Sequence, residues 1–370
     1  MGSRVLIAGG GTAGHVIPGL ALARVLGDRG HDVAFIGTAH GLEARLVAQA
    51  GFEFHRVPAR PFVRKISWEA LKAPFVAVRA MTVARQVVHG ADAVVGMGGY
   101  VSVSTVLAAG RERVPAVLHE QNAVPGLANR ALARMARAVA LSFRDARKFF
   151  PRKLRAEVTG NPVRPDILRV ADERDALAKE ARAVFDLEEG RRTILIFGGS
   201  QGALHIDRAA VGACRLLWAR ADLQIVLIAG PAHLETIGRA LPPSPGGLLV
   251  RLLGYLDRME LAYACADLVV CRSGATTIAE VTACGLPSLQ VPYPYATRRH
   301  QEANARAVQR AGGASVLLDE QLSSESLATR IEGLIDHQER LQATAERARA
   351  FGRPDAGERL ADLVEEVARS

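Results

Sequence analysis

The sequence is poor in aromatic residues and has no long apolar run. Aromatic side chains make up only 5% of its 370 residues, and proteins that bind single-stranded nucleic acid use such side chains as stacking platforms. We therefore expect no nucleic-acid partner. No apolar stretch approaches the roughly 18 residues that a membrane-spanning helix needs, so any membrane contact is expected to be peripheral.

The sequence also lacks the patterns of a metal site. None of its four cysteines forms a C-x-x-C pair, and it contains no D-x-D pair or His/Asp cluster. Scattered thiols of this kind are typical of a protein from a reducing compartment. Because the chain enters a strand pattern at once, we expect no signal peptide. We expect a cytoplasmic protein that uses neither a metal ion nor a cofactor.

Acidic residues are outnumbered, with 38 Asp and Glu against 47 Lys and Arg, for a net charge of +9. Such an excess indicates an anionic partner, which is nucleic acid, an anionic membrane surface or a phosphorylated substrate. The shortage of aromatic residues disfavours the first of these. The content of 49% hydrophobic and 23% charged residues is typical of a folded protein, and the length allows two domains.

Short apolar runs alternate with helical patterns along the chain, which predicts parallel strands joined by right-handed helical crossovers. The expected strands of the first half are Val5–Ala8, Asp32–Ile36, Ala93–Val95, Ala116–Leu118 and Ala138–Leu141. Those of the second half are Thr193–Phe197, Gln224–Ile228, Leu248–Leu252, Leu268–Val270, Ser288–Val291 and Ala314–Leu317.

This pattern starts again at "TILIFGGSQGA", where a strand leads into a second glycine-rich turn, and "VTGNPVRPDIL" before it suits a linker. We therefore predict an α/β fold of two tandem Rossmann-like domains, each a doubly wound parallel sheet, that face a cleft. The expected boundaries are 1–162 for the N-terminal domain and 163–352 for the C-terminal domain. A helix over 353–370 is expected to pack back on the first domain.

The segment "GGGTAGHVIPG" follows the first expected strand. Gly9, Gly11 and Gly14 satisfy G-x-G-x-x-G, a turn whose amides and following helix N-terminus face an anion. A dinucleotide site would also need an acidic residue at the end of the second strand, where this chain has Gly37. We expect a phosphate site that does not hold NAD; the alternative is a turn that only lets a helix pack close to a strand.

Two histidine-containing segments are candidate catalytic elements. His15 stands directly behind the first glycine turn and is either a general base or phosphate contact, or a structural bridge between loops. His119, Glu120 and Asn122 follow a buried strand, so they are expected at its carboxyl end, where open α/β sheets bind ligands. A purely structural loop is the alternative there.

The segment "CRSGATTIAEVTACGLPSLQVP" carries the nucleotide signal of the second half. Its strand and turn lead into an expected helix over Ala275–Ala283, and the amides around Ala275 and Thr276 would face a diphosphate. Glu280 lies roughly one and a half turns into that helix, where a carboxylate can hold both hydroxyls of a ribose. The alternative is a solvated glutamate.

With these segments taken together, the chain resembles the MurG family, the UDP-N-acetylglucosamine transferases that complete the lipid-linked peptidoglycan precursor. Seven motifs carry this resemblance: "GGGTAGHVIPGLALA", "GMGGYVS", "HEQNAVPGLAN", "VTGNPVR", "GGSQGA", "CRSGATTIAE" and "HQEANA". The resemblance implies GT-B glycosyltransferase architecture. It also implies inverting transfer of GlcNAc from UDP-GlcNAc to the 4-hydroxyl of MurNAc in undecaprenyl-pyrophosphoryl-MurNAc-pentapeptide (lipid I), which gives lipid II for peptidoglycan synthesis.

The resemblance assigns the donor mainly to the second domain, with Glu280 on the ribose, and the acceptor diphosphate to the first glycine turn. His15 is the first candidate for the catalytic base and Glu120 the second. The residues implied for UDP-GlcNAc are Thr12, Ala13, Gly14, Asn122, Arg164, Ser200, Leu256, Ala275, Thr276, Thr277, Glu280 and Gln301, with Asn304 as a further candidate. Ala13 often corresponds to glycine in the family, and Arg298 and Arg299 often to acidic or mixed residues.

The stretch "PARPFVRKISWEALKAPFVAVRAMTVAR" interleaves apolar and basic residues around one acid. This pattern fits an interfacial surface on anionic lipid; the alternative is a core helix with a solvated basic face. The expected membrane-facing residues are Phe62, Trp68, Leu71 and Phe75. We expect a peripheral protein on the cytoplasmic face of the bacterial membrane.

Two other functions share this donor site. A UDP-GlcNAc epimerase of GT-B-like fold would turn over UDP-GlcNAc without an acceptor. A non-catalytic nucleotide-sugar-binding subunit that recruits a partner to the membrane would bind UDP-GlcNAc without turnover.

Overall fold

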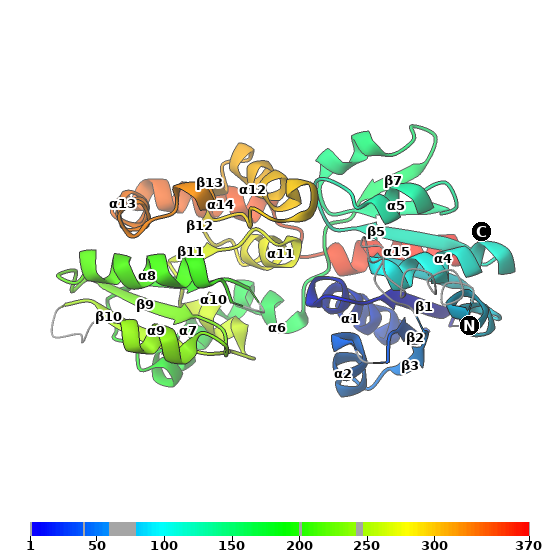
Figure 1. The fold of residues 1–370 in the computed structure, drawn as a ribbon, viewed down its shortest axis with the longest axis horizontal. Helices are drawn as coiled ribbons and strands as arrows, with labels where there is room; N and C mark the ends of the chain where they lie inside the picture. The colour runs from blue at the N-terminus through cyan, green and yellow to red at the C-terminus, as the bar shows by residue number, and fades with distance from the viewer. Residues whose placement is uncertain (1, 40, 59–78, 200–201, 242–246, 370) are drawn as a thin grey trace, which may run out of the picture. The chain divides into compact units, whose positions relative to one another are not determined.

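The computed structural model describes residues 2–39, 41–58, 79–199, 202–241 and 247–369 (Figure 1). The chain divides into two compact units. The first comprises Met1–Arg164 and Pro354–Ser370, and the second comprises Pro165–Arg353. Each unit holds one parallel sheet with helices on both faces, so the predicted fold class is confirmed.

The sheet of the first unit has the strand order β3-β2-β1-β4-β5-β6-β7. Its strands are β1 (Arg4–Gly9), β2 (Asp32–Gly37), β3 (Glu53–Arg56), β4 (Ala93–Gly98), β5 (Ala116–Glu120), β6 (Ala138–Leu141) and β7 (Arg155–Val158). The helical elements are α1 (Ala13–Asp28), α2 (Leu42–Gln49), residues 79–88, α4 (Gly99–Glu112), α5 (Leu127–Leu132), η1 (Arg144–Phe149) and α15 (Ala356–Ala368).

The strands of this sheet are apolar on both faces because helices cover both. In β1, Val5 and Ile7 pack into one core with α1 and α15, whereas Leu6 and Ala8 pack into a second core with α4. A strand buried on both sides reads as a continuous apolar run instead of an alternating pattern. That is why β1 was visible in the sequence.

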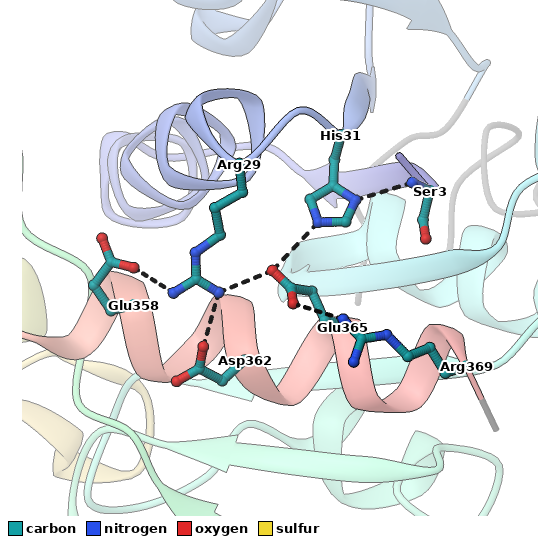
Figure 2. Close-up of polar contacts among 7 residues, drawn as sticks. All are labelled: Ser3, Arg29, His31, Glu358, Asp362, Glu365 and Arg369. Carbon is teal, nitrogen blue, oxygen red and sulfur yellow. Dashed lines mark hydrogen bonds and ion pairs between the residues drawn. The ribbon is translucent and has the colours of Figure 1, made fainter. Parts of the chain in front are cut away.

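The C-terminal helix α15 packs against α1 (Figure 1). Figure 2 shows the polar contacts beside this packing. Arg29, just after α1, donates hydrogen bonds to Asp362 over 2.7 Å and to Glu365 over 2.9 Å, and it also pairs with Glu358. His31 accepts a hydrogen bond from the Ser3 amide at Nδ1 over 3.0 Å, so its Nε2 carries the proton and donates to Glu365.

The second unit repeats the plan with the strand order β10-β9-β8-β11-β12-β13. Its strands are β8 (Arg192–Phe197), β9 (Leu223–Ile228), β10 (Leu249–Leu253), β11 (Leu268–Cys271), β12 (Ser288–Gln290) and β13 (Ala314–Val316). Its helical elements are α6 (Pro165–Leu168), α7 (Val170–Phe185), α8 (Leu204–Leu216), α9 (Leu234–Ala240), α10 (Met259–Cys265), α11 (Ala275–Ala283), η2 (Thr297–Arg299), α12 (His300–Arg310), η3 (Asp319–Gln321), α13 (Ser324–Ile335) and α14 (Gln338–Phe351).

Two strands were not expected from the sequence, β3 and β7. Both lie at the edges of the first sheet, and their sequences, EFHR and RAEV, are only partly buried. Edge strands need less apolar surface than central ones, so a search for apolar runs misses them. Among the residues described, none of the helices combines the length and the apolar character needed to cross a membrane.

Candidate functional site

Each sheet has a switch point, where the connections of neighbouring strands leave in opposite directions. It lies between β1 and β4 in the first sheet and between β8 and β11 in the second. Open α/β sheets bind ligands outside the carboxyl ends of the strands at this point. At least one glycine follows or ends each of these four strands, so each unit has its candidate site where the topology places one.

His15 lies at the switch point of the first unit. It follows the N-terminus of α1, whose N-cap is Thr12. The ring nitrogen Nδ1 of His15 lies 3.1 Å from the carbonyl oxygen of Gly10 and 3.2 Å from Oγ1 of Thr12. A Cβ atom on Gly98, the last residue of β4, would stand 3.0 Å from the imidazole. The absence of a side chain at Gly98 thus leaves room for the ring.

Glu120, at the end of β5, organises the loop that follows it. Its carboxylate accepts hydrogen bonds from the amides of Asn122 over 2.9 Å and Gly126 over 3.2 Å, and from Nδ2 of Asn129 over 2.9 Å. The side chain is 2% exposed. Burial raises the pKa of Glu120, and these hydrogen bonds oppose the rise. The carboxylate therefore has a structural task whether or not it touches a substrate.

His119, the residue before it, points into the protein. Its Nε2 donates a hydrogen bond to the carbonyl of Gly160 over 3.0 Å. Complete burial lowers the pKa of His119 to about 4, because burial disfavours the charged imidazolium. This histidine is neutral at pH 7, and its buried hydrogen bond stabilises the fold.

In the second unit, α11 begins at Ala275 directly after the turn at Gly274. Thr276 and Thr277 lie with Ala275 in its first turn, half-buried, where helix amides are open to an anion. Glu280 lies farther along the same helix and is 6% exposed. The solvated-glutamate alternative is therefore wrong.

Residues of α12 lie near this turn. Asn304 is buried and donates from Nδ2 to the carbonyl oxygen of Ser273 over 3.2 Å, which ties α12 to the loop before α11. Gln301 accepts a hydrogen bond from the amide of Tyr293 over 3.0 Å, so its side chain is oriented by the loop after β12. Leu256 lies half-buried in the loop after β10.

Two models of known families match the chain. The glycosyltransferase family 28 N-terminal domain matches residues 5–141, and the glycosyltransferase family 28 C-terminal domain matches residues 193–363. The UDP-N-acetylglucosamine–N-acetylmuramyl-(pentapeptide) pyrophosphoryl-undecaprenol N-acetylglucosamine transferase of Halothermothrix orenii is 40% identical over 375 residues, which cover 99% of each chain. The chain belongs to the MurG family.

Other members support this assignment. The transferase of the same name from Acidothermus cellulolyticus is 42% identical over 98% of each chain. The crystal structure of Acinetobacter baumannii MurG superposes with a TM-score of 0.80 at 29% identity, over 98% of this chain and 99% of that chain. The resemblance predicted from seven motifs is therefore confirmed over nearly the full length.

For the other residues expected from the sequence, the structure gives less detail. Ser200 and the membrane-facing candidates Phe62, Trp68, Leu71 and Phe75 lie outside the described residues. Arg164 is half-buried and is the last residue of the segment Met1–Arg164 of the first unit. Among the described residues, no three His, Cys, Asp or Glu side chains are grouped so that they could hold a metal ion.

Arg298 and Arg299 have an unusual backbone. Both adopt left-handed conformations, with φ of 56° and 51°, which non-glycine residues seldom do. Both side chains are exposed, and Arg299 lies 3.7 Å from Glu302. The pair forms the turn that starts α12, where Gln301 lies.

Two buried polar residues near the turn before α11 were not identified from the sequence. The hydroxyl of Tyr263, on α10, donates to Glu280 over 2.9 Å. Arg272 is buried directly before the turn, donates to the carbonyl of Val291 over 3.2 Å and pairs with Asp319. Arg272 stood in a quoted motif and could have been noticed as a cation inside an apolar segment. Tyr263 gave no signal, because it stands in an ordinary apolar helix.

Proposed function

We propose that this chain is an inverting glycosyltransferase that moves GlcNAc from UDP-GlcNAc to the 4-hydroxyl of MurNAc in lipid I, giving lipid II for peptidoglycan synthesis. The observation that carries the proposal is the 40% identity over 99% of the chain to a curated transferase with this donor and acceptor in its name. The site geometry adds two glycine-bordered switch points, one in each unit.

In the proposed reaction the acceptor 4-hydroxyl oxygen attacks the anomeric carbon of GlcNAc from the face opposite the diphosphate. The bond from that carbon to the diphosphate oxygen breaks, and UDP leaves with the electron pair. His15 accepts the hydroxyl proton. A positioned base of this kind contributes roughly 10²- to 10⁴-fold to the rate.

We assign the donor to the turn before α11. The open amides of Ala275, Thr276 and Thr277 stabilise the charge that develops on the leaving diphosphate, and Glu280 accepts hydrogen bonds from the ribose hydroxyls. The remaining contacts that we propose for UDP-GlcNAc are Ser200, Leu256, Gln301, Arg164, Asn122, Thr12, Ala13 and Gly14.

We assign the acceptor diphosphate to the N-terminus of α1. His15 is our choice for the base over Glu120, because the Glu120 carboxylate is 2% exposed and already accepts hydrogen bonds from Asn122, Gly126 and Asn129. In this account Glu120 positions the loop that carries Asn122.

We also propose the domain roles and the location. Residues 1–162 bind the acceptor and face the membrane, residues 163–352 bind the donor, and the third region, 353–370, contains the C-terminal helix α15. Phe62, Trp68, Leu71 and Phe75 dock on the anionic cytoplasmic face of the cell membrane, where basic neighbours add electrostatic attraction. Donor binding needs no metal ion and involves no nucleic acid.

The test is release of UDP from UDP-GlcNAc with and without a short-chain lipid I analogue, in the presence of EDTA. Release that depends on the acceptor supports the transferase and a metal-independent donor site. Turnover without the acceptor would indicate an epimerase or hydrolase instead. Intact donor binding with no turnover in either mixture would indicate a binding subunit.

A further inference from the structure

Glu43, at the start of α2, is a buried carboxylate beside the first glycine turn. Its side chain is 1% exposed. Oε1 accepts hydrogen bonds from the amide of Thr38 over 3.1 Å and from its hydroxyl over 2.6 Å, and Oε2 accepts one from the amide of Gly11 over 3.4 Å. One carboxylate thus joins the loops that follow β1 and β2.

Three glycines leave the space that Glu43 fills. A Cβ atom on Gly10 would lie 2.6 Å from Oε1 of Glu43, one on Gly37 would lie 2.7 Å from its Cγ, and one on Gly41 would lie 2.1 Å from Oε2. Real side chains do not approach so closely. Gly10 comes from the loop after β1, whereas Gly37 and Gly41 flank the connection from β2 to α2, so glycines of two loops leave space for this one carboxylate.

The carboxylate is ionised at neutral pH. Burial raises the pKa of Glu43, but the hydrogen bonds from the Thr38 hydroxyl and from backbone amides outweigh it and hold the pKa below its usual value. The Gly11 amide, which in a dinucleotide site would face the ligand, is bonded to an anion inside the protein. This is a second reason why the first turn is not an NAD site.

The Gly10–Gly11 peptide links Glu43 to His15. Its N–H donates to Glu43, and its carbonyl oxygen lies 3.1 Å from Nδ1 of His15. A carbonyl oxygen only accepts hydrogen bonds, so the proton of the neutral imidazole is on Nδ1, and Nε2 is the basic nitrogen. An anion on the N–H side of a peptide strengthens its carbonyl as an acceptor.

We propose that Glu43 is a positioning residue for the reaction. Through the Gly10–Gly11 peptide it holds His15 in the Nδ1–H form, so that Nε2 can take the acceptor proton. In Ser-His-Asp triads the carboxylate bonds the imidazole directly; here one peptide unit stands between them. The proposal rests on the proposed function for the role of His15, but the Nδ1–H form itself does not depend on activity.

The direct test is nitrogen NMR of the full-length protein with labelled histidine rings, in which the His15 signals are assigned by their loss in His15→Asn. The wild type is expected to show the Nδ1–H form, and Glu43→Gln a mixture of both neutral forms. Glu53→Gln, which removes a half-exposed carboxylate on β3, is the matched control and should leave His15 unchanged. A wild-type Nε2–H form, which can be detected without the Glu43→Gln variant, would overturn the proposal, as would an unchanged spectrum in a folded Glu43→Gln.

Kinetics provide the second test. Glu43→Gln should lower kcat about 10-fold, as expected when a group that orients a histidine is lost, with the KM for UDP-GlcNAc unchanged. The acidic limb of the pH–rate profile should move to lower pH, because the carboxylate no longer favours the imidazolium. His119 also interacts electrostatically with His15, and it is unaltered in this variant.

A kcat of Glu43→Gln within about twofold of wild type would contradict the proposal. Full activity of His15→Ala would instead contradict the function assigned to His15 and would leave the NMR result unaffected.

Discussion

The hydroxyl of Tyr263 donates a hydrogen bond to Oε2 of Glu280 over 2.9 Å. The two residues come from α10 and α11, and their side chains are 0% and 6% exposed. Burial and the neighbouring carboxylate raise the pKa of Tyr263 well above its usual value, so the phenol remains a donor. A carboxylate offers about four acceptor positions, and this bond fixes the orientation of Glu280, which we propose as the ribose contact.

Replacing Tyr263 with phenylalanine should weaken UDP binding about 10-fold. The variant loses the hydrogen bond that orients the Glu280 carboxylate, so the carboxylate is free to rotate and has to be ordered again when UDP binds; a 10-fold change in Kd corresponds to about 1.4 kcal/mol. Calorimetric titration with UDP measures the effect, and the loss should be smaller for 2′-deoxy-UDP. Tyr295→Phe, at an 84% exposed tyrosine, is the control. An unchanged Kd in a folded Tyr263→Phe would contradict this role.

Glu120→Gln should destabilise the first unit more than it slows the reaction. The NH2 group of glutamine takes the place of one carboxylate oxygen and cannot accept a hydrogen bond. In the position of Oε1 it loses the bond from Asn122, and in the position of Oε2 it loses the bonds from Gly126 and Asn129. A buried donor left without an acceptor costs about 1–3 kcal/mol. Denaturant unfolding measures the stability, and kcat at a temperature where the variant is folded measures the activity. A kcat as low as that of His15→Ala would indicate that Glu120 acts as the catalytic base.

Arg29→Met should loosen the C-terminal helix. Arg29 bonds Asp362 and Glu365 and is only partly exposed, so we expect a loss of about 1 kcal/mol, smaller at high salt. The hydrogen bond from Arg29 lowers the pKa of Glu365. This stabilisation is therefore present at neutral pH and disappears as the pH falls through the folded-state pKa. Thermal unfolding at pH 7 and pH 3, with Arg24→Met on α1 as control, measures both effects. Equal losses of stability in the two variants would contradict the role of Arg29.

His119 should make the first unit sensitive to mild acid. Its folded-state pKa is about 4, against about 6.5 in an unfolded chain, so the unfolded state binds the extra proton in between. Stability should fall as the pH drops from about 6.5 to about 4, by on the order of 3 kcal/mol at most. Denaturant unfolding of wild type and His119→Gln across this range measures it. The same pH dependence in both would show that another group is responsible.

The central strands and the motifs could be predicted from the sequence because each depends on neighbouring residues. Apolar runs marked β1 and β8, and glycines marked the turns after them. The site partners could not be predicted in this way, because Tyr263 reaches Glu280 and Glu43 reaches Gly11 only after the chain has folded. The carboxylate that bonds the amide of Gly11 comes from α2, whereas the acidic residue of a dinucleotide site would stand at the end of β2.

The central claim is that His15 removes the proton from the acceptor hydroxyl. The most direct measurement is kcat for acceptor-dependent UDP release by His15→Ala, together with its Kd for UDP. We predict that kcat falls by roughly 10²- to 10⁴-fold while the Kd for UDP stays within about twofold of wild type. A kcat close to that of the wild type would contradict the account.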